Sequence, residues 1–317
     1  MGLLLLGACS SNKADGNDSS VTEVSNSNSE VLSRPKFNAD SAYQYVEKMV
    51  SFGPRVPNTD AHRKGGDFIV KTLKESGWAV TEQKDVIHTF DGTKLNMRNI
   101  FAQINPDDSV RLLLITHWDC RPWADKDPDT AKRKEAVPGA NDGASGVGVL
   151  LEIARQLSAQ KPNMGVDLLF LDAEDWGSED DEDSWALGAQ YFTSHLPYTG
   201  TLPQQAILLD MVGSNNAQFG FEYFSEQANI NLLNQLWDNA SNLGYGKYFH
   251  KGYGGAATDD HIWFNKIGIP TIDIIDFRTG EYETGFDPVW HTTKDDMNNI
   301  SKQTLRAVGE TVLTAVK

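Results

Sequence analysis

Five short strand-like runs, several of them almost wholly apolar, restrict the fold of this 317-residue chain more than any other feature. Such runs are typical of strands that are buried on both faces of a sheet. Segments with helical spacing of apolar residues separate them, and strands alternating with helices favour right-handed crossovers. We therefore expect an α/β fold, a three-layer sandwich with helices on both faces of a mixed, mostly parallel central sheet. The runs are RNIFAQI (98–104), RLLLITH (111–117), VDLLFLD (166–172), QAILLDM (205–211) and PTIDIID (270–276).

The chain divides into a short leading segment and one domain. Residues 37–317 are expected to be a single domain, because no linker rich in Pro, Gly or Ser interrupts them. Residues 1–36 begin with an apolar stretch and continue with Ser, Asn and Asp, so they are expected to be a signal followed by a flexible tether. Helical spacing is found at residues 40–51, 60–76, 144–157, 185–195, 226–243, 258–267 and 301–316.

The charge of the chain excludes one class of partner. The formal net charge is −16 and the pI is near 4.8. A protein that binds nucleic acid needs a basic face for the phosphates, so we expect no nucleic acid partner. The same charge disfavours contact between the protein surface and an anionic membrane.

The two cysteines lie in unrelated contexts. Cys9 ends the apolar run of MGLLLLGACSSNK, which resembles a bacterial lipoprotein signal with its lipobox, and Cys9 would then carry the lipid. The run is short and no Lys or Arg precedes it, so a plain secretory signal or an unstructured apolar tip are the alternatives. A lipoprotein is expected in the bacterial cell envelope, on the periplasmic side, with the membrane reached only through Cys9. Cys120 is expected to be a semi-buried bystander, with metal ligation as the alternative.

Four apolar runs end with, or close to, a side chain capable of chemistry. Because parallel strands carry such residues toward one edge of the sheet, we expect them to lie near each other. A single acid at a strand end is as often a helix cap or a solvated group, so only the joint placement favours a site. The four residues are His117, Asp172, Asp210 and Asp276.

Three further acids lie in strings that suit a metal site. Asp142 belongs to the Gly-rich string GANDGASGVG (139–148), where close backbone packing leaves a carboxylate free to face a cation. An N-cap for the helix that opens at Ala144 is the alternative, and a phosphate loop lacks the required Lys. Glu174 and Asp175 are adjacent in LDAEDWG (171–177). Neighbouring side chains in extended backbone point apart, so one can bind a metal while the other faces a substrate.

Two histidines also lie in strings that suit a metal site. His291 in DPVWHTTKDD (287–296) would bind zinc through an imidazole nitrogen. His117 ends a strand two residues before Asp119, which would share its face and orient the imidazole. The acidic run SEDDEDSW (178–185) is expected to be a solvated loop, with a calcium site as the alternative.

These strings also carry a resemblance. In order, HWD (117–119), GANDGASG (139–146), AED (173–175), LLDMVG (208–213), TDDHIWF (258–264) and VWHT (289–292) resemble the zinc aminopeptidase-type enzymes and, among them, the glutaminyl-peptide cyclotransferases. The resemblance extends from about residue 40 to the end. The cyclotransferase branch is favoured by TDDHIWF, by the Trp290-His291 pair, and by Asp175 where aminopeptidases usually carry Glu.

The resemblance implies a metal site for residues 37–317, which would be the catalytic domain. One Zn²⁺ per chain would be bound by Asp142, Asp175 and His291, with a fourth position open to water or substrate. His117 and Asp210 would complete a two-metal set of the aminopeptidase kind, so the number of metal ions stays open.

It also implies roles in catalysis. Glu174 would transfer the proton, Asp260 would bind the substrate, and Asp210 would be a hydrogen-bonded partner in the site. Trp290 would be the wall against which a glutamine side chain packs. Three other tryptophans are expected to be packing residues, with a place in the pocket wall as the alternative: Trp118, Trp123 and Trp263.

The implied activity is an intramolecular aminolysis. The α-amine of an N-terminal glutamine, on a peptide or protein, attacks its own side-chain amide, which releases ammonia and leaves pyroglutamate. The nearest alternative is a zinc aminopeptidase with one or two metals, in which Glu174 would activate water. A further alternative is a non-catalytic lipoprotein binding domain. A monomer is expected.

Overall fold

The computed structural model describes residues 34–316, which lie within one compact unit, Leu32–Lys317. The expected lipidation at Cys9 and most of the expected tether lie outside the described residues. The strands are β1 (Ala79–His88), β2 (Lys94–Ile104), β3 (Arg111–His117), β4 (Gly165–Leu171), β5 (Gln205–Leu209), β6 (Phe219–Glu222), β7 (Phe249–Gly255) and β8 (Thr271–Ile274). The α-helices are α1 (Ala39–Ser51), α2 (Asp60–Glu75), α3 (Ala144–Ala159), α4 (Leu187–Ser194), α5 (Tyr223–Asn242), α6 (His261–Lys266) and α7 (Lys302–Leu313).

A six-stranded sheet forms the middle layer, in the order β1-β2-β4-β3-β5-β8. The pairs β4/β3, β3/β5 and β5/β8 are parallel, whereas β1/β2 and β2/β4 are antiparallel. The expected mixed, mostly parallel sheet is therefore confirmed, and every expected strand lies in it. Because β3, β4, β5 and β8 run the same way, their carboxyl ends meet at one edge of the sheet.

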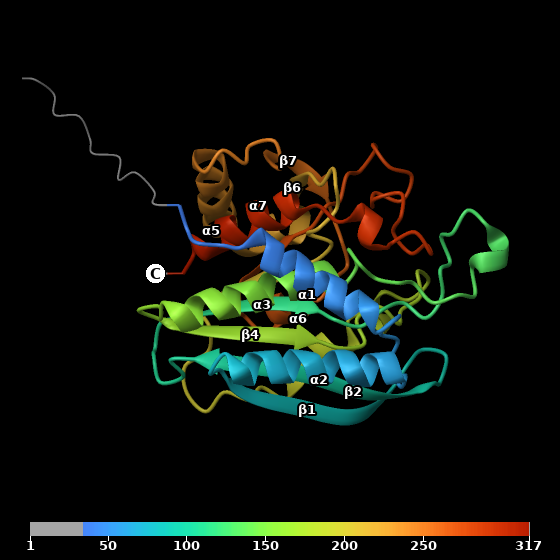
Figure 1. Ribbon diagram of the computed structural model, residues 1–317, viewed down its shortest axis with the longest axis horizontal. Coiled ribbons are helices and arrows are strands. Elements are labelled where there is room, and N and C mark those ends of the chain that lie inside the picture. Colours follow the sequence, from blue (N-terminus) through green and yellow to red (C-terminus); the bar gives the residue numbers. More distant parts are fainter. Residues whose placement is uncertain (1–33, 317) are drawn as a thin grey trace, which may run out of the picture. The chain divides into compact units, whose positions relative to one another are not determined.

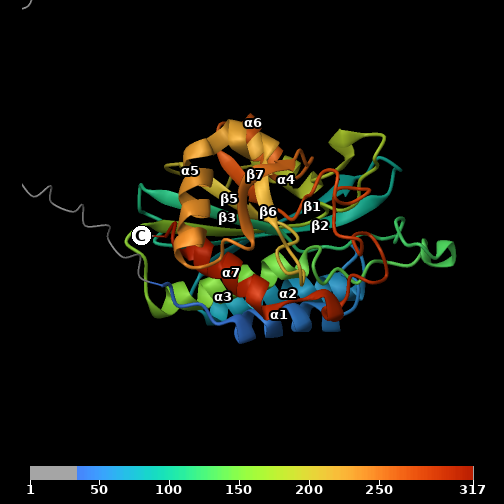
Figure 2. The same cartoon turned by 90° about the horizontal axis from the view of Figure 1, so that it is seen from above.

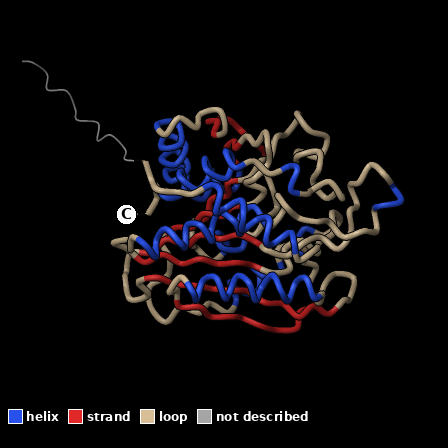
Figure 3. Tube along the Cα trace, in the orientation of Figure 1, coloured by secondary structure: helices blue, strands red, loops and turns tan. Residues whose placement is uncertain are grey.

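Helices cover both faces of this sheet. Helices α1, α2, α3 and α7 lie on one side and α4, α5 and α6 on the other, as seen edge-on (Figure 2). Figure 1 shows α1, α2 and α3 lying in front of the strands, and Figure 3 shows the same helices (blue) over the strands (red) in the same view. The three-layer sandwich is confirmed. Among the described residues, no helix has the length and apolar character needed to cross a membrane.

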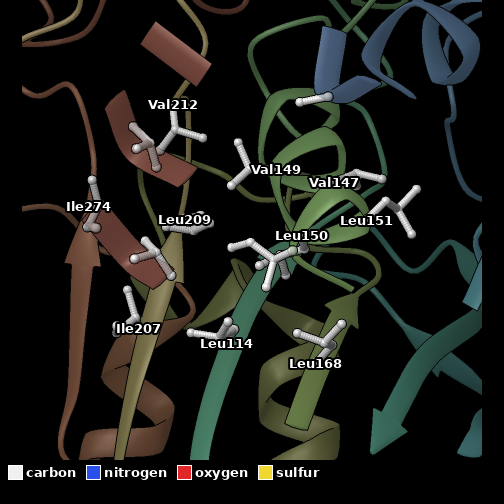
Figure 4. Packing of buried hydrophobic residues seen from close by; sticks show 14 of the residues in the cluster. Leu114, Val147, Val149, Leu150, Leu151, Leu168, Ile207, Leu209, Val212 and Ile274 are labelled. Atoms are coloured by element: carbon white, nitrogen blue, oxygen red, sulfur yellow. The ribbon is translucent and has the colours of Figure 1, made fainter. Parts of the chain in front are cut away.

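The main core lies between α3 and the parallel strands. Leu150 of α3 is fully buried with Leu114, Leu168 and Ile207 of β3, β4 and β5 (Figure 4). Burying each such side chain contributes about 1.5–3 kcal/mol. Gly148 lets α3 approach α1, because a Cβ there would lie 2.7 Å from the carbonyl oxygen of Ala42. This packing holds the first turn of α3, and the loop before it, against the strand ends.

Three strands were not expected from the sequence. β1 is largely exposed, with only intermediate and exposed residues, so it lacks the apolar run that marks the buried strands. β6 and β7 form a separate short sheet whose pairing is irregular and rich in glycine. Near the end of the expected tether, Arg34 donates hydrogen bonds to the side chain of Glu310 and to the carbonyl of Leu243.

Candidate metal centre and active site

A cavity of about 550 Å³ opens at the carboxyl ends of the parallel strands. Glu174 and Asp175 reach it from the loop after β4, and Asp210 from the residue after β5. Other lining residues come from the loop before α3 and from the segment before α7, namely Asp142, Trp290 and His291. The sequence-predicted strings therefore meet in one place.

Asp142, Asp175 and His291 form the first group of candidate ligands. The Nε2 atom of His291 lies 3.1 Å from Oδ1 of Asp175 and 3.6 Å from Oδ2 of Asp142. The ligand atoms of the three residues lie within 4.8 Å of one another. Both carboxylate oxygens of Asp175 are buried without a hydrogen-bond partner, which is costly unless a cation binds them. The three residues thus fit a zinc ion.

The backbone around these ligands is held by acids that the sequence did not single out. Asp295 accepts the N–H groups of Asn141 and Asp142, at 2.8 and 3.0 Å, and so fixes the turn that carries Asp142. Asp125 lies 3.5 Å from Nδ1 of His291 and accepts two hydrogen bonds from Arg121. Carboxylates in such positions orient metal-binding imidazoles. In the sequence, Asp125 lies near His117 and Asp295 lies near His291. This closeness was the only signal that could have identified the two acids.

His117 belongs to a second group of candidate metal ligands, with Asp142 and Asp210. Its Nε2 atom lies 3.0 Å from Oδ1 of Asp142 and 3.1 Å from Oδ1 of Asp210. On the other side of the ring, Nδ1 lies 3.4 Å from Oδ1 of Asp119. Asp119 also accepts the N–H groups of Glu174 and Asp175, so it links β3 to the loop after β4. A complete two-metal ligand set is therefore assembled.

Two carboxyl groups in the cavity are poised to hold a proton. Burial, followed by the charges of Asp259, Asp175 and Asp260, raises the pKa of Glu174 well above its ordinary value, although His117 opposes the shift. Burial also raises the pKa of Asp210 to about 7. Carboxyl groups with raised pKa values beside candidate metal ligands are typical of general acid–base catalysis.

The acids of the TDDHIWF string occupy different places. Asp259 lines the cavity, whereas Asp260 is fully buried (0% exposed) and does not line it. Asp260 precedes α6 with helical backbone angles, and neither of its carboxylate oxygens has a hydrogen-bond partner. The residue with direct access to the cavity at this position is thus Asp259, which the sequence did not distinguish from its neighbour.

Aromatic side chains form one wall. Trp290 stacks on the ring of His291 with ring centroids 3.6 Å apart, and Phe286 lies 4.4 Å from Trp290. The other tryptophans considered pack elsewhere, as expected. Trp118 stacks on His62, Trp123 meets Trp176 edge to face, and Lys266 lies over the ring of Trp263.

The remaining strand-end acids have structural partners. Asp172 binds His62 at 2.8 Å, and Asp276 accepts two hydrogen bonds from Arg278, and neither acid lines the cavity.

Cys120 is more deeply buried than expected, at 1% exposure, and burial raises its thiol pKa to about 12.

The acidic loop is exposed over residues 179–183, as expected. Glu179 and Glu182 line the rim of the cavity. Among the described residues, no group with metal-binding geometry includes this loop.

A mostly parallel sheet with a His/Asp metal centre at the carboxyl ends of its strands defines a metal-dependent enzyme of the zinc exopeptidase type. Residues 99–316 match the profile of Peptidase family M28, and the chain belongs to this family.

Two solved structures show which members of this family the chain resembles. The chain is 49% identical to the glutaminyl cyclase of Porphyromonas gingivalis, with a TM-score of 0.86, over 88% of this chain and 97% of that one. It is 47% identical to a Zn-dependent exopeptidase from Parabacteroides distasonis, with a TM-score of 0.86, over 89% and 98% of the two chains.

The resemblance to the glutaminyl-peptide cyclotransferases is thus confirmed. A curated relative, the glutaminyl-peptide cyclotransferase of Bos taurus, is 25% identical over 65% of this chain. The chain spans 55% and 62% of the lengths of the first two curated relatives that it matches.

Proposed function

We propose that the protein is a zinc-dependent glutaminyl-peptide cyclotransferase, which converts the N-terminal glutamine of peptides and proteins to pyroglutamate and releases ammonia. The observation that carries this proposal is the position of Glu174. Its carboxyl group lines the cavity beside the ligand group of Asp142, Asp175 and His291. The 49% identity to a bacterial glutaminyl cyclase supports the same choice.

One zinc ion per active site is proposed. Asp142, Asp175 and His291 would hold it, and when bound it supplies a Lewis acid that polarises the substrate's amide carbonyl. The distribution of unsatisfied groups supports a single ion. Neither oxygen of Asp175 has a hydrogen-bond partner, although Oδ1 lies 3.5 Å from Arg121, whereas Nε2 of His117 and Oδ1 of Asp210 satisfy each other at 3.1 Å.

The proposed chemistry moves one proton between two nitrogen atoms. The neutral α-amine attacks the side-chain amide carbon, so a new N–C bond forms while the original amide C–N bond breaks. Glu174 takes a proton from the attacking amine and returns it to the departing nitrogen, which leaves as ammonia. No water molecule is consumed.

Other residues would hold the substrate in position. Asp210 and Asp259 line the cavity and are the proposed acceptors for N–H groups of the substrate. Asp260, buried next to Asp259, is proposed to position that acid and not to touch the substrate. Trp290 is the proposed wall for the glutamine side chain, since its ring is stacked on His291 within the cavity.

A direct assay separates this activity from aminopeptidase activity, the second candidate, which the two-metal ligand set favours. A Gln-initiated peptide is incubated with the zinc-loaded protein, and ammonia and peptide length are measured. Cyclisation releases ammonia and leaves the number of residues unchanged. Release of free glutamine, or cleavage of a Leu-initiated control peptide, would instead identify an aminopeptidase. Inactivity of the zinc-loaded protein on both peptides would favour a non-catalytic binding domain.

The cellular location is also a proposal. The lipobox-like sequence before Cys9 supports a lipid anchor on the periplasmic side of a bacterial envelope. The anchored protein is proposed to be a monomer. Growth with labelled fatty acid should label the wild-type protein and not the variant Cys9→Ser. Labelling of both proteins would contradict the anchor at Cys9.

A further inference from the structure

A buried guanidinium group lies behind the candidate metal ligands and has no task in the proposed reaction. Arg121 follows the end of β3 by four residues, and its side chain is 3% exposed. It does not line the cavity, so it does not contact a substrate there. Burying a charged side chain is costly unless the charge is paired and its donors are satisfied. The partners of Arg121 therefore indicate what the group holds in place.

The first partner is the acid behind His291. Nε and Nη2 of Arg121 donate to Oδ1 and Oδ2 of Asp125, each at 2.8 Å, in the bidentate geometry that a planar guanidinium favours. The same Oδ1 atom of Asp125 lies 3.5 Å from Nδ1 of His291. Because Arg121 holds both of its oxygens, Asp125 faces the imidazole in one orientation. A carboxylate so placed orients a histidine that binds a metal through its other nitrogen.

The second partner is the loop that carries Asp175. Nη1 of Arg121 donates to the carbonyl oxygens of Asp175 and Gly177, at 3.2 and 3.3 Å. It also lies 3.5 Å from Oδ1 of Asp175, an oxygen without a hydrogen bond. The loop comes after the end of β4 at Leu171, so strand pairing does not hold it. One guanidinium group therefore joins the backbone beside one candidate ligand to the acid beside another.

Aromatic rings enclose the same group. The guanidinium carbon lies 5.0 Å from the ring centroid of Trp123 and 4.8 Å from that of Trp185. Trp185 in turn stacks with His291, with ring centroids 6.1 Å apart and planes inclined by 18°. A planar guanidinium can stack on such rings and donate from its edge at the same time, whereas the compact ammonium of lysine cannot. The surroundings are therefore specific for arginine.

We propose that Arg121 is a positioning residue of the metal centre, which fixes the Asp175 loop and, through Asp125, the imidazole of His291. A positive charge near Asp175 repels a cation, but the bidentate pair with Asp125 neutralises most of this charge. Ligands that are already in place lower the conformational cost of binding. The net effect of Arg121 is therefore to strengthen zinc binding. The inference rests on the metal centre of the proposed function.

The zinc affinity of matched variants tests this role. The Kd for zinc is measured by competition with a chromophoric chelator. Arg121→Gln should raise it by about 10- to 100-fold, as expected when a support of a metal ligand is removed. Arg121→Lys should raise it less, and it keeps the test available where Arg121→Gln does not fold. The control is Arg111→Gln, which breaks a bidentate pair with Asp167 near the other end of β3 and should leave the Kd unchanged.

Denaturant unfolding without zinc separates positioning from general stability. A variant of Arg121 that is less stable than the wild type but binds zinc equally well would assign the residue to the fold alone and overturn the proposal. If the wild-type protein then still cyclises a Gln-initiated peptide, the proposed function stands. A wild-type protein that binds no zinc would overturn both.

A double-variant cycle tests the route through Asp125. Asp125→Asn keeps the size of the side chain and removes the charge that pairs with Arg121. Because the two residues act on His291 together, Arg121→Gln should raise the Kd for zinc by a smaller factor in Asp125→Asn than in the wild type. Equal factors in the two backgrounds would show that Arg121 does not act through Asp125 and would contradict that part of the proposal.

Discussion

Two adjacent residues with similar side chains have separate proposed tasks. Glu174 and Asp175 both line the cavity. They lie in a loop and not in extended backbone, because β4 ends at Leu171 and Ala173 adopts a left-handed conformation with φ of 54°. The chain leaves the extended geometry there, and alternation no longer applies. Asp175 can then meet His291 while Glu174 remains free of side-chain partners.

Replacing Glu174 by Gln should separate proton transfer from metal binding. The amide keeps the size of the side chain but cannot carry the proton, so kcat should fall by about 10²- to 10⁴-fold. Zinc content should stay unchanged, because Glu174 is not among the ligands. Steady-state assay and elemental analysis check both points, with Glu182→Gln at the cavity rim as control. An unchanged kcat would remove Glu174 from the role proposed for it.

Replacing His291 by Ala should remove the active-site zinc. A site with three protein ligands has no spare donor, so losing one weakens binding strongly. His117→Ala serves as the matched control, because His117 belongs to the group that the single-zinc proposal leaves without metal. The zinc absorption edge signal at Asp142 and Asp175 distinguishes the two variants. Full occupancy there in His291→Ala would show that the ligand assignment is wrong.

At the scale of elements, buried segments were predictable and exposed ones were not. The strands β3, β4, β5 and β8 stand out because they are apolar on both faces, and each is found where the sequence indicated. β1 is paired along its whole length with β2, yet its side chains are exposed and carry no apolar pattern. The ligand residues at strand ends could be predicted from the motifs. The role of Asp295 could not be predicted, because it accepts backbone N–H groups that only the fold brings near.

The turn before α3 should tolerate no side chain at Gly143. This residue has φ of +88°, and a Cβ would lie 2.7 Å from the carbonyl oxygen of Asp119. Gly77, at the end of α2, has a similar φ of +83° but open space around it. Gly77→Ala should cost about 1 kcal/mol of unfolding free energy, and Gly143→Ala roughly 1–3 kcal/mol more.

Gly143→Ala should also weaken zinc binding, because Asp142 moves with the turn. Denaturant unfolding and zinc titration of the two variants measure both effects. Equal losses of stability, with equal zinc affinity, would mean that the turn is not as tightly enclosed as the structure indicates.

At the scale of the whole molecule, the layered core and the net charge followed from the sequence, whereas the depth of individual side chains did not. Cys120 illustrates this. It follows a strand end, where partial exposure is common, but the segment of Pro138 and Gly139 packs against its sulfur and only 1% of the residue is exposed. The number of side chains packed over a given residue depends on the tertiary arrangement, which periodicity does not encode.

Cys120 should therefore report global unfolding. Burial and a thiol pKa of about 12 leave almost no reactive thiolate at neutral pH. In a Cys9→Ser variant, native protein should be unreactive toward a thiol reagent, and reaction should appear only across the denaturant transition. Rapid labelling of the folded protein at pH 7 would show that the region opens locally.

The source of the attacking atom is the most direct test of the proposed reaction. A Gln-initiated peptide is turned over by the zinc-loaded protein in water enriched in heavy oxygen, and the products are analysed by mass spectrometry. Attack by the substrate's own amine predicts a full-length product that has lost one ammonia and contains no heavy oxygen. Heavy oxygen in a released glutamine, or in a glutamate formed from it, would mean that water is the nucleophile and would contradict cyclisation.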